Sequence, residues 1–436
     1  MKPTIHRLKN KIPVILVPQA GVASMTFMVF VKVGSRYETE EINGASHFIE
    51  HLMFKGTRRR PTTLMISKEL DRYGAEYNAS TGKDLTSYYV KMDAAHTPLA
   101  IDLLHDMLFH SKFDAAEIQR ERGVIIEEIK MYEDHPSSHL FDLLEQTLYP
   151  SSTLGWEITG PREVIRSVSR EALCAYRDRY YIPSRLSLVL AGKIHPRALS
   201  LLQKTFGQVR VPAHPDDATF APFVPPPSLK HALAFQSKKI EQVQLGLAFH
   251  GLPYGHAQMP AMRLLSTILG GSMSSRLFTE VRERRGLCYS IQAGHQSFED
   301  TGMFSISSGL DHERVHEAAS AIWRELKRLC DTPVSADELR RAKDHLRGHW
   351  TLALEDSSHQ ADWYGRQWVF QSGLQTPEER VRIMERVQPK ELRELARKLF
   401  DPTAMALSVI GPYPRRAQVE KDLAALLTLE QKRKTA

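Results

Sequence analysis

The chain has 436 residues, 42% hydrophobic and 25% charged, so it has enough apolar material for packed cores and wholesale disorder is excluded. Its 58 Lys and Arg against 51 Asp and Glu leave a net charge of +7, and because the two signs are interspersed this excludes a nucleic-acid-binding footprint. The sequence has no run of about 18 apolar residues and no apolar segment typical of a signal peptide, and its three cysteines are scattered. We therefore expect a cytoplasmic protein with no membrane association.

Hydrophobic periodicity predicts an alternation of strands and helices in the first half of the chain. Alternating apolar residues indicate strands, and apolar residues three and four apart indicate helices. In chain order the expected elements are strands 14–17 and 25–33, helices 44–54 and 63–73, a strand ending at residue 90, and helices 98–109 and 115–132.

A proline-rich segment, VPAHPDDATFAPFVPPPSLK, separates this half from a second one of similar length. Because prolines fix φ and lack an N–H donor, we expect an extended linker at 212–229 between domains 1–211 and 230–436. The second half repeats the first in order, with strands 232–235 and 243–249, helices 260–269 and 275–284, a further strand, and helices 313–330 and 335–354. Without a Rossmann glycine fingerprint, this pattern predicts an α+β fold class: two homologous domains, each a sheet covered by helices.

The most informative segment is NGASHFIEHLMF, at residues 43–54. On a helix His47 and His51 are one turn apart, so both imidazoles project from one face, as two nitrogen ligands of a tetrahedral zinc require. Glu50 is close enough to act as general base on a metal-bound water without being a ligand. The plainer alternative is a half-buried helix that carries two histidines and an acid by chance. The motif alone does not exclude it, because catalytic zinc sites usually have three protein ligands and the motif supplies two.

A third ligand could come from the predicted helix 115–132. Glu121 and Glu128 are seven residues apart, two turns along one helical face. One carboxylate could bind the metal while the other hydrogen-bonds a histidine ligand. The residues alone do not choose between Glu127 and Glu128, and the alternative for any acid here is a solvated helix face.

These motifs resemble the pitrilysin/insulinase family of zinc peptidases, the zincins with an inverted His-x-x-Glu-His motif. In that family a glutamate ligand follows after 76 intervening residues, and here 76 residues separate His51 from Glu128. The resemblance therefore selects Glu128 as the ligand and places the family's supporting glutamate at Glu121. The stretches 43–57 and 121–134 look like the bacterial members closest to the catalytic subunit of the mitochondrial processing peptidase.

The resemblance implies a zinc metalloendopeptidase that hydrolyses short or unfolded polypeptides in an enclosed chamber. Its domain 1–211 would be catalytic, and the two domains would close as half of a clamshell. The residues that it assigns to Zn²⁺ are His47, His51 and Glu128, with Glu50 as the base.

The family's substrate-binding residues also have matches in this sequence. Its Arg/Tyr pair corresponds to Arg282 and Tyr289, in the C-terminal domain, where a guanidinium and a phenol would bind substrate oxygens. Its substrate-pairing edge strand corresponds to Asn78 and Ala79. The plainer readings are a surface charge for Arg282 and a core aromatic for Tyr289.

Where a second metal motif would fall, the second half has Arg263 followed by LLSTILGG, which implies one active site per chain. Long family members hold four such domains, so we expect a second chain, in a homodimer or in a heterodimer with a related subunit. The alternative function is a non-catalytic peptide-binding or scaffold subunit, although such subunits typically lose the motif residues that are present here. A nucleic-acid binder has only the net charge in its favour.

Overall fold

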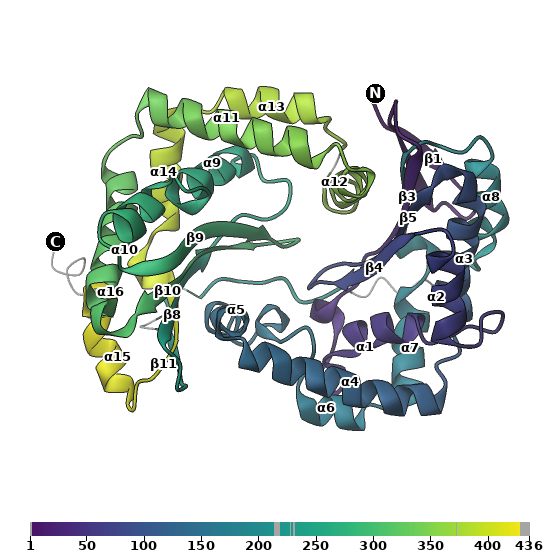
Figure 1. The fold of residues 1–436 in the computed structure, drawn as a ribbon, viewed down its shortest axis with the longest axis horizontal. Helices are drawn as coiled ribbons and strands as arrows, with labels where there is room; N and C mark the ends of the chain where they lie inside the picture. Colours follow the sequence, from purple (N-terminus) through teal and green to yellow (C-terminus); the bar gives the residue numbers. More distant parts are fainter. Residues whose placement is uncertain (1, 213–218, 227, 230–231, 372, 428–436) are drawn as a thin grey trace. The chain divides into compact units, whose positions relative to one another are not determined.

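The computed structural model describes residues 2–212, 219–226, 228–229, 232–371 and 373–427, which form two compact units (Figure 1). Unit 1 comprises Met1–Lys130, Trp156–Ala221 and Thr351–Thr376. Unit 2 comprises Met131–Gly155, Pro222–Trp350 and Pro377–Ala436. The predicted linker at 212–229 includes residues 213–218 and 227, which lie outside the described residues.

Unit 1 is built on a sheet whose described strands follow the order β1-β2-β6-β3-β5-β4. Strands β2 and β6 are parallel, and all other neighbouring pairs are antiparallel. Strands β3 and β6 are almost entirely buried because the sheet is covered on both faces, whereas β4 alternates between exposed and half-buried residues at the edge. The strands are β1 (Thr4–Arg7), β2 (Pro13–Pro18), β3 (Ser24–Val31), β4 (Glu76–Thr81), β5 (Thr86–Asp93) and β6 (Leu186–Gly192).

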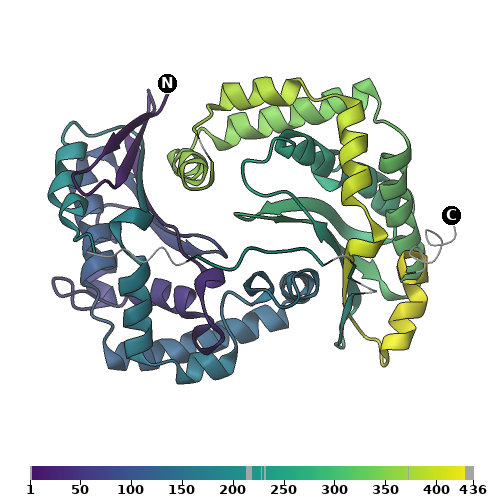
Figure 2. The ribbon, with the colours of Figure 1, turned by 180° about the vertical axis from the view of Figure 1, so that it is seen from behind.

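Helices cover both faces of this sheet (Figures 1 and 2). The larger core lies on the face against which α1 and α3 pack. On the opposite face α12 packs Ala361 and Tyr364 against Phe30 and Val189. The helices are α1 (Ala45–Met53), α2 (Thr63–Asp71), α3 (Thr97–His110), α4 (Ala115–Asp134), α6 (Arg162–Ser167), α7 (Arg170–Tyr180), α8 (Ala198–Lys204) and α12 (Ser357–Phe370).

Unit 2 repeats this sheet without the first strand. Its described strands follow the order β7-β11-β8-β10-β9, with the same single parallel pair, β7 with β11, so the strand directions match those of β2-β6-β3-β5-β4. The predicted fold class, two α+β units with helix-covered sheets, is confirmed. The strands are β7 (Leu233–Ser237), β8 (Gln242–His250), β9 (Cys288–Ser297), β10 (Gly302–Asp311) and β11 (Met405–Gly411).

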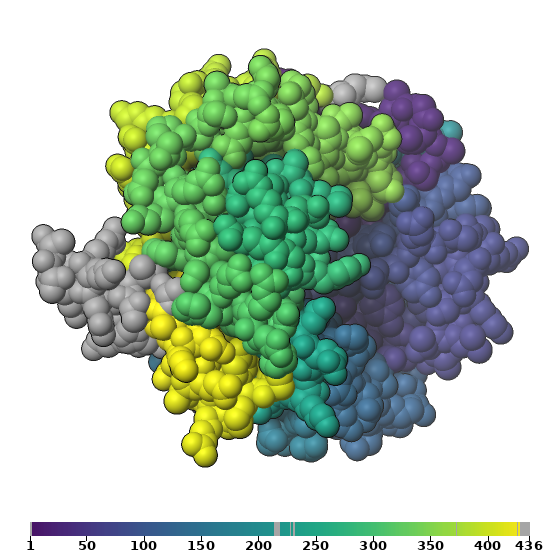
Figure 3. Space-filling model, turned by 60° about the vertical axis from the view of Figure 1, so that its left-hand side comes forward, coloured from purple at the N-terminus to yellow at the C-terminus, as the bar shows by residue number. Residues whose placement is uncertain are grey.

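The helices of unit 2 pack on its sheet and on one another, and Figure 3 shows α10 and α15 next to each other on its surface. Across the described part of the chain, no helix is both long enough and apolar enough to cross a bilayer. The helices are α5 (Pro136–Leu148), α9 (Met259–Gly270), α10 (Val315–Asp331), α11 (Ala336–Ala353), α13 (Pro377–Glu385), α14 (Pro389–Leu399), α15 (Arg416–Asp422) and α16 (Ala424–Leu427).

The two compact units are not continuous halves of the chain, because two helices each pack on the sheet formed by the other half. Helix α5, from the first half, packs on β8 and β11 of unit 2, and α12, from the second half, packs on β3 and β6 of unit 1. Both contacts are close: a Cβ on Gly246 would lie 2.7 Å from Leu144, and a Cβ on Gly365 would lie 2.0 Å from the Phe30 ring. An amphipathic helix buries its apolar face on whichever sheet it reaches, so sequence order alone does not define these units.

The close approach of α12 to β3 gives a stability prediction. Gly365→Ala should destabilise the protein by about 1–3 kcal/mol, because the added methyl must displace the fully buried Phe30 ring. Gly348, in α11, is the matched control, since nothing lies within 4 Å of the position of its Cβ. Gly348→Ala should be neutral or stabilise by about 0.5–1 kcal/mol. Urea unfolding measures both, and equal effects would contradict the packing described.

Candidate metal centre

Helix α1 presents both histidines of the motif because its other face is buried. Phe48, Ile49 and Leu52 are in the core of unit 1, which leaves His47 and His51 on the remaining face. The two Nε2 atoms lie 3.2 Å apart.

The first turn of α1 is fixed by Glu38, a residue that the sequence analysis did not single out. Its buried carboxylate accepts the backbone N–H groups of Gly44 and Ser46, both at 2.7 Å, and the Asn43 side-chain amide at 2.9 Å. These bonds satisfy helix N–H groups that have no partner within the helix. Burial raises the pKa of Glu38, although the hydrogen bonds oppose the shift.

Helix α4 brings the third ligating atom from 77 positions further along the chain than His51. Glu128 Oε2 lies 3.4 Å from His51 Nε2 and 3.6 Å from His47 Nε2. Glu127, the neighbour that the residues alone left open, has a 71% exposed side chain that pairs with Lys130. The structure thus places Glu128, and not Glu127, beside the histidines.

The three atoms match the geometry of a tetrahedral metal site. Bonds of about 2.0–2.1 Å to zinc give a tetrahedron whose edges are roughly 3.3–3.4 Å, close to the observed separations of 3.2, 3.4 and 3.6 Å. Two imidazoles and one carboxylate are also a ligand set typical of zinc with an open fourth position. Within the described residues, His47, His51 and Glu128 form the one group of three or more potential ligands that converge in this way.

Glu121 lies on the other side of the His51 ring. Its Oε1 is 2.8 Å from His51 Nδ1, and its Oε2 is 2.7 Å from Lys55 Nζ. Burial opposes ionisation of Glu121, yet the hydrogen bonds from His51 and Lys55 keep its pKa below the ordinary value. The predicted supporting glutamate is therefore within hydrogen-bonding distance of a candidate ligand.

The pKa values of the ligating groups report a negative environment around His51. Burial lowers the pKa of His51, but hydrogen bonds to Glu121 and Glu128 raise it to about 9 overall. Hydrogen bonds from His47 and His51 hold the pKa of Glu128 well below its usual range. Each shift follows from the contact between imidazole and carboxylate, which favours the charged form of both groups.

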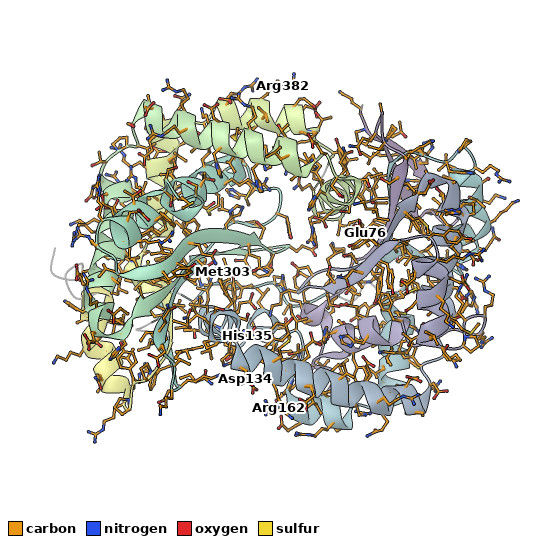
Figure 4. The ribbon with its side chains drawn as sticks, in the orientation of Figure 1. Glu76, Asp134, His135, Arg162, Met303 and Arg382 are labelled. Atoms are coloured by element: carbon orange, nitrogen blue, oxygen red, sulfur yellow. The ribbon has the colours of Figure 1, made fainter. Side chains whose placement is uncertain are left out.

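Glu50 is held by the edge strand of the sheet. Its Oε2 accepts a hydrogen bond from the Thr81 hydroxyl, at the end of β4. Asn78 and Ala79 lie on the same strand, opposite Tyr89 and Tyr88 of β5, and within the described residues β4 pairs on this side alone. In Figure 4, β4 can be found by the label of Glu76 at its start, and α4 by the label of Asp134 at its end.

Arg282 and Tyr289 lie together in unit 2. The Arg282 guanidinium is 4.5 Å from the Phe278 ring centre and 5.5 Å from that of Tyr289. Tyr289 is 75% exposed, so it is not a core aromatic. The predicted helix 275–284 contains a π-helix, Phe278–Glu283, a wider turn that is frequent at functional sites and that apolar periodicity does not reveal.

Comparison with known proteins identifies the class of the chain. Residues 14–162 match the family described as Insulinase (Peptidase family M16), and residues 167–346 match the Peptidase M16 inactive domain. A protein of Bacillus subtilis named as an uncharacterized zinc protease is 35% identical over 407 residues, which cover 93% of this chain and 98% of that protein. The rat mitochondrial-processing peptidase subunit beta is 31% identical over 408 residues, covering 91% of this chain and 82% of that protein.

The chain therefore belongs to peptidase family M16, as its resemblance to the pitrilysin/insulinase family predicted. A solved protease from Helicobacter pylori superposes with a TM-score of 0.88 at 23% identity, covering 94% of this chain and 99% of that one. An M16-like peptidase from Alicyclobacillus acidocaldarius gives 0.84 at 19% identity, covering 94% and 98%. These likenesses support the fold.

The geometry predicts which of two adjacent acids binds metal. Glu128→Gln should lose stoichiometric zinc, because the amide carries no negative charge to the cluster. Glu127→Gln removes the same charge from an exposed position and should keep zinc at one ion per chain. Metal analysis of the purified variants after dialysis checks this. Zinc retained in Glu128→Gln, or lost in Glu127→Gln, would show that the assignment is wrong.

Proposed function

We propose that this chain is a zinc-dependent endopeptidase that hydrolyses peptide bonds in short or unfolded polypeptides. The observation that carries the proposal is the convergence of His47, His51 and Glu128 at tetrahedral spacing, with Glu50 on the same helix. Relatives named as zinc proteases support it.

The ligands and the base have separate roles. His47, His51 and Glu128 would hold Zn²⁺, which when bound supplies Lewis acidity and lowers the pKa of water to about 7. Glu50 takes a proton from the attacking water and delivers it to the leaving amine. Glu121 accepts the Nδ1–H of His51, so that the ring keeps Nε2 toward the other ligands.

Strand β4 offers a means of holding the substrate. Its outer edge, at Asn78 and Ala79, can pair with an extended peptide through main-chain hydrogen bonds, which select for unfolded segments. This edge ends at Thr81, which contacts Glu50, so a peptide on β4 lies next to the base. We propose that Arg282 and Tyr289 bind substrate backbone oxygens.

We further propose that a second chain completes an enclosed chamber, in a homodimer or in a heterodimer with a related subunit. One relative is named as a subunit of a processing peptidase, which supports an assembly. We also propose a cytoplasmic location, which fits the absence of disulfides among Cys174, Cys288 and Cys330 in the described part of the chain.

The alternative, a non-catalytic scaffold subunit, has less support. The match described as an inactive domain covers residues 167–346, whereas His47, Glu50, His51 and Glu128 all lie within the match at 14–162. The chain keeps every residue that the proposed chemistry requires.

The role of Glu50 gives the decisive test. Glu50→Gln should keep zinc and lower the turnover of a random peptide library by about 10²–10⁴-fold, because the amide cannot accept the proton. Glu127→Gln is the matched control and should turn over normally, since its side chain is exposed. Hydrolysis by Glu50→Gln at the wild-type rate would reject this role, and a wild-type enzyme without activity or zinc would favour the scaffold.

The hydrogen bond from Thr81 predicts a smaller effect. Thr81→Val keeps the shape of the side chain but removes the donor to Glu50, so kcat should fall about tenfold while zinc content stays the same. Thr81→Ser keeps the hydroxyl and should retain most of the activity. Steady-state kinetics on one quenched-fluorescence peptide compare the variants; equal kcat for Val and Ser would argue against a positioning role for Thr81.

A further inference from the structure

Lys55 lies four residues beyond His51, in the bend that follows α1, two residues after the helix ends at Met53. Its backbone is tightly placed, because its N–H bonds to the carbonyl of Leu52 at 3.1 Å. The next residue, Gly56, has φ +116°, and a Cβ there would lie 2.5 Å from the Pro61 carbonyl oxygen. The chain therefore turns sharply after Lys55, whose side chain reaches Glu121 on α4.

Lys55 contacts the metal cluster through Glu121. Its Nζ is 2.7 Å from Glu121 Oε2, while Glu121 Oε1 is 2.8 Å from His51 Nδ1. The Glu121 side chain is 3% exposed and that of Lys55 is 25% exposed. Each oxygen of one buried carboxylate thus has its own donor, in a continuous chain of contacts from Lys55 to the His51 ring.

Removing Lys55 would leave Glu121 Oε2 buried without its donor. An unsatisfied buried acceptor is costly, and the last torsion of a glutamate is soft, so the carboxylate would rotate toward another donor. That rotation would break its bond to His51. His47 has no comparable orienting hydrogen bond, because within the described residues its Nδ1 is buried without a hydrogen-bond partner.

We propose that Lys55 is a positioning residue of the metal centre: it holds the Glu121 carboxylate against His51 and thereby orients His51 for zinc. The inference rests on the proposed function, since it requires zinc at this cluster. The competing explanation is that the pair of Lys55 and Glu121 only ties the segment after α1 to α4, in which case stability would change and zinc affinity would not.

Zinc affinity tests the proposal on the purified full chain. The protein is stripped with a chelator and titrated with Zn²⁺ against a chromophoric competitor. Lys55→Met and Glu121→Gln should each weaken zinc binding by about 10-fold or more, as is typical for groups that orient a ligand. Because Lys55 acts through Glu121, the double variant should bind zinc no more weakly than Glu121→Gln alone.

Two further variants separate orientation from charge. Lys55→Arg restores a cationic donor and should recover zinc affinity to within about threefold of wild type. Lys130→Met removes a lysine from the exposed pair with Glu127 on α4, so it should bind zinc as wild type does. Lys55→Gln is measured beside Lys55→Met so that the comparison does not depend on the folding of one variant, and urea unfolding of the zinc-free proteins monitors the tie between the helices.

Two results would overturn the proposal and leave the proposed function standing. One is wild-type zinc affinity in Lys55→Met. The other is a loss of zinc affinity in the double variant that equals the sum of the losses in Lys55→Met and Glu121→Gln. A wild-type chain that binds no stoichiometric zinc would overturn both.

Discussion

The packing of α1 against α4 puts a carboxylate on each nitrogen of the His51 ring, and the proposed chemistry depends on this contact. Glu121 lies 2.8 Å from Nδ1, and Glu128 lies 3.4 Å from Nε2. Two acids and two imidazoles in so small a space favour a cation. The raised pKa of His51 follows from the two carboxylates beside it, and the lowered pKa of Glu128 follows from the two imidazoles beside it.

The contact is supported from several directions. Glu38 fixes the first turn of α1 through backbone N–H groups, Lys55 holds Glu121, and Thr81 holds Glu50 from the sheet edge. Each support comes from a different segment of unit 1. Groups that orient ligands and bases in this way place the reacting atoms before substrate arrives, which is the main source of precision in such sites.

Among the residues that the structure describes, the candidate metal site occurs in unit 1 and has no counterpart in unit 2, although the two units share a fold. Their sheets share strand order and strand direction. Yet the residues that replace the metal motif on α9 include Arg263, whose pKa is lowered by burial and whose guanidinium lies 5.6 Å from the Trp350 ring centre. Function thus follows from the side chains placed on the fold and not from the fold itself.

The sequence by itself determined what local periodicity encodes. The four-residue spacing of His47 and His51 puts both on one helical face whatever surrounds the helix, and the repeated order of strands and helices predicts two similar sheets. The choice of Glu128 over Glu127 needed the family resemblance, because the residues alone left both open. Only the tertiary structure decided the supports at Glu38, Lys55 and Thr81, the π-helix at Phe278–Glu283, and the sheets on which α5 and α12 pack. The physical reason is that hydrophobic period fixes which residues share a face, whereas the partner of that face is set by packing between segments far apart in the chain.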